Sequence, residues 1–294
     1  MFDRMLVPLD GSTFAEAALP LALTLARRGG GCVRLVAVHE AVPAFAYGDR
    51  DEAARTWARD YLEQLREKLV ATTEQDISTA VREGGVVDEI RHEAEAWPAD
   101  VVVMATHGRG AVSRVWLGSV ADGCVRRVNR PVLLVRPPQG SDAPDFTASD
   151  VSRVVVPLDG SPLAEGALDG AARLSELFEA PLSLIRAVAY PIGPMSPYLP
   201  HTIEMSRQVV DDARDAAERY LGEVAERMRA RGLEVDATVV TDQHAAHAIL
   251  EHAGDDPVAM ATHGRSGMER ALLGSVADKV IRGAGGPVLA LRPR

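Results

Sequence analysis

The segment RMLVPLDGS, residues 4–12, returns almost unchanged as RVVVPLDGS at residues 153–161. Three later segments return in the same order: MATHGR at 104–109 and 260–265, LGSVAD at 117–122 and 273–278, and PVL at 131–133 and 287–289. A set of matched segments in one order indicates an internal repeat. The chain therefore contains two copies of one structural unit.

The repeat divides the 294 residues into two domains of ordinary size, which we expect at residues 1–137 and 151–294. Residues 138–150 are rich in Pro, Gly, Ser and Asp and have no hydrophobic periodicity, so they are predicted to form a linker. The second copy has gained residues in its middle, and we expect the extra length in the Pro-rich stretch 190–200.

Within each copy, short apolar runs alternate with helical patterns. In the first copy we expect helices over 14–28, 50–74 and 90–96 and another opening near Gly108, and strands at 5–9, 33–38, 77–81, 101–104 and 132–135. Strands separated by helices require crossover connections and hence a parallel sheet. The predicted fold class is α/β: two tandem doubly wound domains, each a five-stranded parallel sheet with helices on both faces. Such sheets bind ligands beyond the carboxyl ends of their strands.

Composition excludes several classes of protein. Hydrophobic residues make up 47% of the chain and charged residues 25%, as in soluble globular proteins. A formal net charge of −10 disfavours a nucleic-acid partner, which needs a basic surface. The apolar runs are too short to span a membrane. Two cysteines outside any CxxC motif favour a reducing compartment, so a cytoplasmic location is expected.

A glycine-spaced loop follows the fourth strand of each copy. Gly108 is followed after nine residues by Gly118-Ser119, and Gly264 after nine residues by Gly274-Ser275. Glycines allow an anion to approach the backbone, and a helix N-terminus directs its amides at that anion. One interpretation is therefore a phosphate cradle. The alternative is that these glycines only turn a strand into a helix; recurrence beside identical Pro-Leu-Asp-Gly-Ser turns favours the cradle.

Asp10 and Asp159 end the first strand of their copies, where the ligand crevice is expected. A carboxylate there can accept hydrogen bonds from a ribose or a base edge. The alternative role is capping of the helix that follows, although the neighbouring serine is itself a suitable cap.

The remaining candidate side chains do not assemble into a known catalytic or metal motif. His244, His247, Glu251 and His252 crowd one helix, but the first copy has no matching set, so an exposed helix face is favoured over a metal site. His107 and His263 are interpreted as structural residues. The sequence contains neither a GxxxxGK[ST] loop nor a recognisable triad, and no catalytic residue is predicted.

These residues resemble the universal stress protein family, and the resemblance covers both copies in the manner of its tandem-domain class. Nucleotide-binding members carry Gly, two residues, Gly, nine residues and Gly-Ser/Thr after the fourth strand, and an Asp after the first. The resemblance implies that phosphates and ribose are held by Gly108, Gly118, Ser119 and Val120 in the first copy and by Gly264, Gly274, Ser275 and Val276 in the second. It implies that adenine and ribose are lined by Pro8, Leu9, Asp10, Val38 and Met104, and by Pro157, Leu158, Asp159, Ala187 and Met260.

One departure from the family motif is clear: its first glycine is Ala105 in the first copy and Ala261 in the second. A methyl group at these pocket positions can crowd the ligand. Val38 offers more apolar contact to a base than Ala187, so the first pocket is expected to bind more tightly.

Taken with the resemblance, the residues favour a stress-response protein that binds ATP, with or without Mg²⁺, and lacks efficient catalysis. Nucleotide would then modulate the association of domains or of subunits in a homodimer, and the apolar final strands, 131–135 and 287–291, are candidates for pairing the two copies. Two alternatives stay open. One is a slow ATPase or autokinase, for which Asp10 and His107 are the only obvious pair; the other is a structural dimer with empty pockets.

Overall fold

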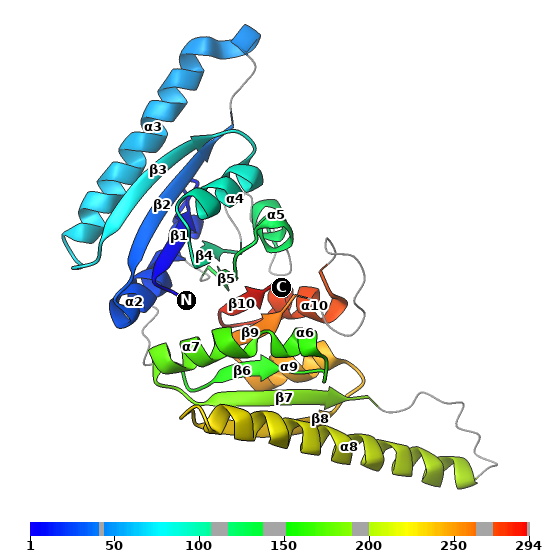
Figure 1. The fold of residues 1–294 in the computed structure, drawn as a ribbon. Helices are drawn as coiled ribbons and strands as arrows, with labels where there is room; N and C mark the ends of the chain where they lie inside the picture. The colour runs from blue at the N-terminus through cyan, green and yellow to red at the C-terminus, as the bar shows by residue number, and fades with distance from the viewer. Residues whose placement is uncertain (41–43, 107–116, 138–150, 190–199, 263–272, 293–294) are drawn as a thin grey trace. The chain divides into compact units, whose positions relative to one another are not determined.

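The structure is a computed structural model that describes residues 1–294 except 41–43, 107–116, 138–150, 190–199, 263–272 and 293–294 (Figure 1). Each sequence copy contributes five described strands. The elements of the first copy are β1 (Arg4–Pro8), α1 (Thr13–Glu16), α2 (Leu19–Gly29), β2 (Cys32–His39), α3 (Ala44–Val70), β3 (Ile77–Glu83), α4 (Val86–Ala96), β4 (Val101–Ala105), α5 (Ser119–Arg127) and β5 (Val132–Val135). Those of the second are β6 (Val154–Pro157), α6 (Pro162–Glu165), α7 (Leu168–Phe178), β7 (Leu182–Val188), α8 (Pro200–Arg229), β8 (Val235–Thr241), α9 (Ala245–Ala253), β9 (Val258–Ala261), α10 (Ser275–Gly283) and β10 (Val288–Leu291).

The chain forms two compact units, and the predicted α/β class with a mostly parallel sheet is confirmed. Of the described residues, the first unit contains 1–137 together with Pro287–Arg292, and the second begins at Val151. In the first unit the strand order is β3-β2-β1-β4-β5 and these pairings are parallel. In the second unit β9, β6, β7 and β8 are neighbours in that order, again with parallel pairings.

The second copy has its predicted fifth strand, β10, which is next to β9 in the strand order. This strand belongs to the first unit, where it pairs antiparallel with β5 through Leu289 opposite Leu133. The expected pairing of the two final strands is therefore present. All residues of β5 and β10 are buried, which explains why both strands are apolar throughout.

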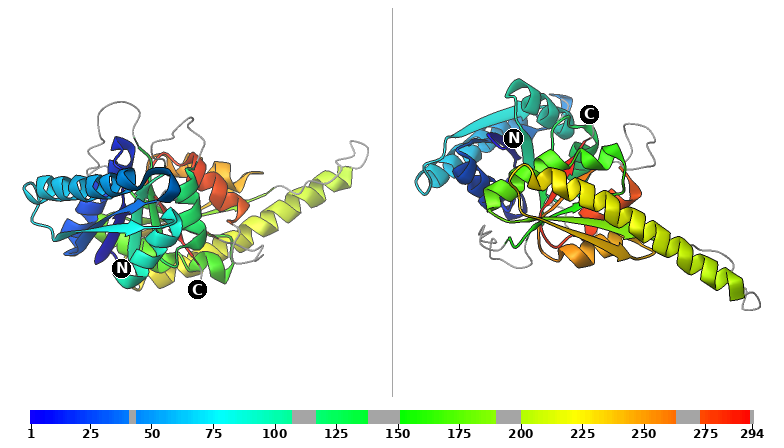
Figure 2. Two further views of the ribbon diagram at one scale, coloured as in Figure 1. Left: turned by 90° about the horizontal axis from the view of Figure 1, so that it is seen from above. Right: turned by 60° about the horizontal axis from the view of Figure 1, so that its bottom comes forward.

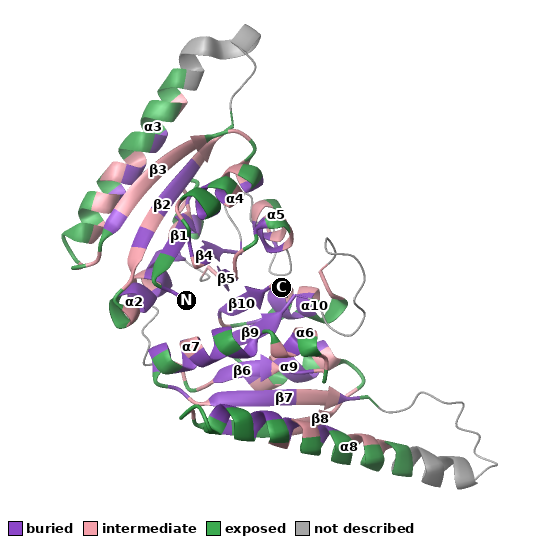
Figure 3. Cartoon of the chain, viewed as in Figure 1, coloured by how far each residue is buried: buried purple, intermediate pink, exposed green. Residues whose placement is uncertain are grey.

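In the second unit helices cover both faces of the sheet, and side-chain alternation along β7 demonstrates this. Ser183 bonds His252 of α9, with its Oγ 2.8 Å from Nε2, whereas Arg186 contacts Tyr220 of α8. Residues an odd number of positions apart point to opposite faces of a strand, so α8 and α9 lie on opposite faces. Figure 2 shows α3 and α8 running along the outermost strands of their units, and Figure 3 shows buried residues concentrated in the strands.

The helix expected over residues 14–28 is interrupted. The helix breaks between α1 and α2 because Pro20 has no N–H to bond the Glu16 carbonyl; Ala17 and Ala18 instead form tighter bonds of 3.3 Å. Phe14 before the break is 40% exposed, whereas Leu21 and Leu25 after it are buried.

Other boundaries shift by a few residues. α3 begins at Ala44 rather than near residue 50, and α4 at Val86 rather than near 90. The described part of the helix expected near Gly108 begins at Ser119. Across the described part of the chain, no helix combines the length and apolar composition needed to cross a membrane.

Candidate functional site

The turn after β1 is built around Asp10. Its Oδ1 accepts hydrogen bonds from the Ser12 N–H at 2.9 Å and from the Ser12 hydroxyl at 2.6 Å. Ser12 in turn caps α1, because its Oγ accepts the Ala15 N–H at 3.2 Å. Gly11 between them has φ +78°, a left-handed conformation that favours glycine. Serine is thus the helix cap, and Asp10 fixes the turn at the carboxyl end of the strand.

The second copy repeats this turn. Asp159 Oδ1 accepts the Ser161 N–H at 2.9 Å, Ser161 Oγ accepts the Ala164 N–H at 3.2 Å, and Gly160 has φ +86°. The capping role that sequence left open for the aspartates therefore belongs to the serines. The aspartates lie outside the helices, at the sheet edge where α/β folds bind ligands.

The helix N-termini of the predicted phosphate cradles lie within the described residues. Gly118 is the N-cap of α5, and its N–H donates to the Thr106 carbonyl at 2.8 Å, just beyond β4. Gly274 caps α10 and donates to the Thr262 carbonyl at 2.9 Å. Each cap therefore anchors its helix N-terminus to the carboxyl end of the neighbouring strand. The helix dipole and free amides at such a terminus favour an anion.

The predicted residues of each pocket come from adjacent strand ends. Asp10 follows β1, Val38 lies near the end of β2, and Met104 and Ala105 end β4; β2 and β4 flank β1. The same placement holds for Asp159, Ala187, Met260 and Ala261 on β6, β7 and β9. The helix starts add exposed Ser119 and Ser275, with Val120 and Val276 beside them. Pro8, Leu9, Pro157 and Leu158 precede the two aspartates.

Ala105 and Ala261, where the family motif has glycine, end extended strands and do not have positive φ. Alanine therefore imposes no backbone strain at these positions. Gly108 and Gly264, with His107 and His263, lie outside the described residues.

The histidines of α9 do not converge. His247 lies on the exposed side, with Nδ1 2.9 Å from Asp242 Oδ2, and this carboxylate raises the pKa of the imidazole. His252 lies inward against Ser183, and burial, with a smaller effect of Arg153, lowers its pKa. Within the described ranges, no three His, Cys, Asp or Glu side chains are grouped as metal ligands would be.

A duplicated Tyr–Glu pair beside each Asp turn was missed by sequence reasoning. The Tyr61 hydroxyl donates to Glu16 Oε1 at 2.8 Å, and the Tyr220 hydroxyl donates to Glu165 Oε1 at 3.0 Å. Both glutamates lie on the short helix that follows the turn, and both tyrosines on the long helix α3 or α8. The matched Glu in FAE and LAE was visible in sequence, but its partner on a distant helix was not.

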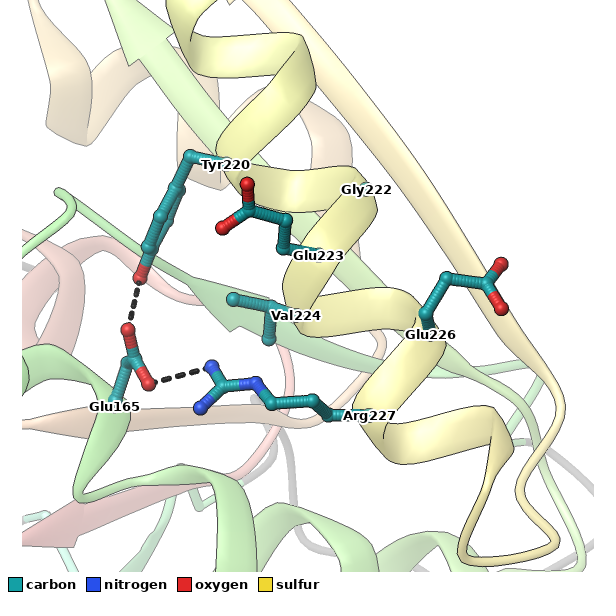
Figure 4. A pocket seen from close by; sticks show the side chains of 7 residues that line it. All are labelled: Glu165, Tyr220, Gly222, Glu223, Val224, Glu226 and Arg227. Carbon is teal, nitrogen blue, oxygen red and sulfur yellow. Dashed lines mark hydrogen bonds and ion pairs between the residues drawn. The ribbon is translucent and has the colours of Figure 1, made fainter.

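In the second copy this pair borders a surface hollow of about 830 Å³ between α6 and α8 (Figure 4). Tyr220 and Arg227 point from α8 toward Glu165, and Arg227 Nη2 donates to Glu165 Oε2 at 2.6 Å. Burial and the Glu165 carboxylate raise the pKa of Tyr220. The phenol is therefore neutral at pH 7 and acts as a hydrogen-bond donor.

The two tyrosines differ in what covers their rings. Tyr61 stacks on Trp57 with ring centroids 5.4 Å apart, whereas Tyr220 carries the Arg186 guanidinium 5.1 Å from its centroid. A charged residue inside an apolar strand was a visible signal for Arg186 that sequence reasoning did not use.

Comparison with known proteins agrees with this architecture. The family model described as the universal stress protein family matches residues 1–136 and 151–292. A universal stress protein of Mycobacterium tuberculosis (strain ATCC 25618 / H37Rv) is 30% identical over 227 residues, covering 76% of this chain and 70% of the relative. One from Mycolicibacterium smegmatis is 28% identical over 306 residues and covers 99% and 97%.

Among solved structures, a universal stress protein from Archaeoglobus fulgidus matches with a TM-score of 0.71 and 21% identity, covering 99% of both chains. This likeness concerns the fold. The family assignment rests on the two matched regions, which together include most of the residues. The chain belongs to the universal stress protein family and carries two tandem domains of that family.

Proposed function

We propose that each copy binds one adenine nucleotide, ATP, at the carboxyl edge of its sheet, and that the protein acts by binding rather than by efficient catalysis. One observation carries the proposal. An Asp-centred turn and a glycine-capped helix N-terminus follow neighbouring strands, and the same combination occurs twice.

The donor set fits the parts of a nucleotide. Amides at the starts of α5 and α10, with the Ser119 and Ser275 hydroxyls, suit phosphate oxygens. The carboxylates of Asp10 and Asp159 suit a ribose hydroxyl or a base amine, and Met104 and Met260 supply apolar surface beneath a base. Mg²⁺, when bound with ATP, would neutralise phosphate charge. Bound nucleotide would change how the domains or subunits of this stress-response protein associate.

Substitution of the helix caps tests the binding sites one at a time. Gly118→Asp adds a side chain and a negative charge beside the expected phosphates, so ATP affinity at the first site should fall at least tenfold. Gly274→Asp should do the same at the second site. Isothermal titration gives the affinity and stoichiometry, and Gly222→Asp, inside α8 where an added Cβ would meet no atom within 4 Å, is the control. Unchanged stoichiometry and affinity in folded cap variants would reject the cradle.

Turnover distinguishes binding from the enzymatic alternative, a slow ATPase or autokinase. We expect purified protein to hydrolyse ATP far more slowly than the median enzyme rate of about 10 per second. Phosphate release and autophosphorylation should be measured with Mg²⁺ present. A rate near that median which Asp10→Asn abolishes would favour the enzyme.

A further inference from the structure

The two candidate sites differ by one charged residue on the second strand of each copy. Val7 pairs with Leu35 in the first copy, and the matching Val156 pairs with Leu184 in the second. Two positions further along these strands, the first copy has Ala37 and the second has Arg186. Ala37 is buried, whereas Arg186 is half-buried.

The Arg186 guanidinium is held at the Asp159 turn. A Cβ built on Gly160 would lie 3.0 Å from Nη1 and 3.3 Å from Nη2 of Arg186, so both amino groups border the residue next to Asp159. The guanidinium also lies over the Tyr220 ring, whose hydroxyl donates to Glu165. Among the described residues, Arg186 forms no ion pair with a carboxylate. Its donors are therefore held in place by an aromatic face rather than saturated by an acid.

Sheet order places Arg186 at the end of the site opposite the phosphate cradle. β6 lies between β9 and β7; the cradle follows β9, the Asp159 turn follows β6, and Arg186 lies on β7. A nucleotide with its 5′-phosphates at α10 and its ribose at Asp159 would have that ribose near Arg186. The 5′-phosphate chain would extend away from it.

We propose that Arg186 makes the second site selective for adenine nucleotides that carry an additional phosphate on the ribose 2′ or 3′ oxygen. This inference rests on the proposed function, nucleotide binding at that site. An acidic residue that binds a ribose hydroxyl repels a phosphate there, whereas a nearby Arg accommodates it in dinucleotide-binding folds. The guanidinium fork also matches phosphate oxygens geometrically. The first site, with Asp10 and Ala37, takes a nucleotide with unphosphorylated ribose.

The test compares AMP with adenosine 2′,5′-bisphosphate and adenosine 3′,5′-bisphosphate by isothermal titration. In the Gly118→Asp background, which isolates the second site, at least one bisphosphate should bind about tenfold more tightly than AMP. Adding Arg186→Ala should abolish that ratio, and Arg186→Lys should retain part of it. In the Gly274→Asp background, Ala37→Arg should create a preference at the first site. Which bisphosphate responds identifies the ribose position.

The titrations distinguish failure of the proposed selectivity from failure of nucleotide binding itself. If wild-type protein binds ATP and AMP at two sites but neither bisphosphate is preferred, the selectivity is rejected while nucleotide binding stands. If no nucleotide binds, both are rejected. A preference for GMP over AMP that disappears in Arg186→Ala would also overturn the ribose assignment, because it places the base against the guanidinium. Thermal unfolding of Arg186→Ala and Arg186→Lys confirms that the compared variants are folded.

Discussion

Among single residues, Glu93 shows that the two copies have different side chains at corresponding buried positions. Its side chain is fully buried; Oε1 accepts from Arg34 Nη1 at 3.0 Å, and Oε2 pairs with Arg82. Arg34 also lies over the Trp97 ring at 4.8 Å. By the strand registers, the second copy has Ser183 and Val240 at the two arginine positions, and Ser183 contacts His252 as Arg34 contacts Glu93. The fold therefore accommodates either an ion cluster or a Ser–His contact at this place.

Removing only the buried Glu93 carboxylate should destabilise the first unit. Glu93→Ala leaves two arginines without their shared partner and should lower the free energy of unfolding of the first unit by about 3 kcal/mol. Urea denaturation measures this loss. Glu95→Ala, on the exposed side of the same helix, should change stability by no more than about 0.5 kcal/mol.

Replacing all three residues of the ion cluster should lower the free energy of unfolding less than removing Glu93 alone. A variant with Arg34→Ser, Arg82→Val and Glu93→His copies the second unit and, with the imidazole neutral, leaves no buried charge unpaired. We expect it to unfold at a higher urea concentration than Glu93→Ala. Equal or lower stability of the triple variant would mean that the ion cluster is required in the first copy's surroundings.

At the scale of elements, strands were easier to predict than helix boundaries. β4 and β5 are buried on both faces, so their residues are continuously apolar and the strands are evident from sequence. The break between α1 and α2 depends on a missing backbone donor at Pro20, which a helical pattern of apolar residues does not reveal. The aspartates and helix caps of the candidate site were predicted from repeated motifs. Tyr61 and Tyr220 were not, because pairing across distant helices has no local sequence period.

Helix α9 carries two histidines with opposite pKa shifts, which NMR titration can resolve. His247 should titrate above its usual value near 6.5 because Asp242 stabilises the imidazolium, and His252 below it because of burial. Asp242→Asn should lower the His247 midpoint and leave that of His252 in place. A common midpoint for both histidines in the folded protein would contradict the two environments.

The shifts fix the sign of the stability change with pH. The raised pKa of His247 gives stability that is present below about pH 6.5 and lost as pH rises through its folded value. The lowered pKa of His252 acts oppositely: stability is present above about pH 6.5 and lost as pH falls through its folded value. His252→Gln removes the titrating imidazole but keeps a polar side chain beside Ser183. The loss of unfolding free energy at acid pH should therefore be smaller in this variant, as measured by urea denaturation at several pH values.

At the scale of the whole molecule, the first unit depends on a strand that is distant in sequence. Leu289 of β10 is fully buried and faces Leu133 of β5. Leu289→Asp should place an unpaired charge in this core and accelerate hydrogen exchange at the β5 amides by more than tenfold. Lys279→Asp, on the exposed side of α10, should leave β5 exchange unchanged. Equal protection of β5 in both variants would mean that β10 contributes little to the unit.

The placement of β10 also has a consequence for protein synthesis. β5 leaves the ribosome about 150 residues before its antiparallel neighbour, an interval of roughly 10–30 s at ordinary translation rates. During that time the nascent first unit has one unpaired, apolar strand edge, the feature that recruits foreign strands. A chain released between the two strands would keep that edge permanently. Premature termination within the second copy is therefore expected to yield products that associate through β5 or require a chaperone, even though their first five strands are all present.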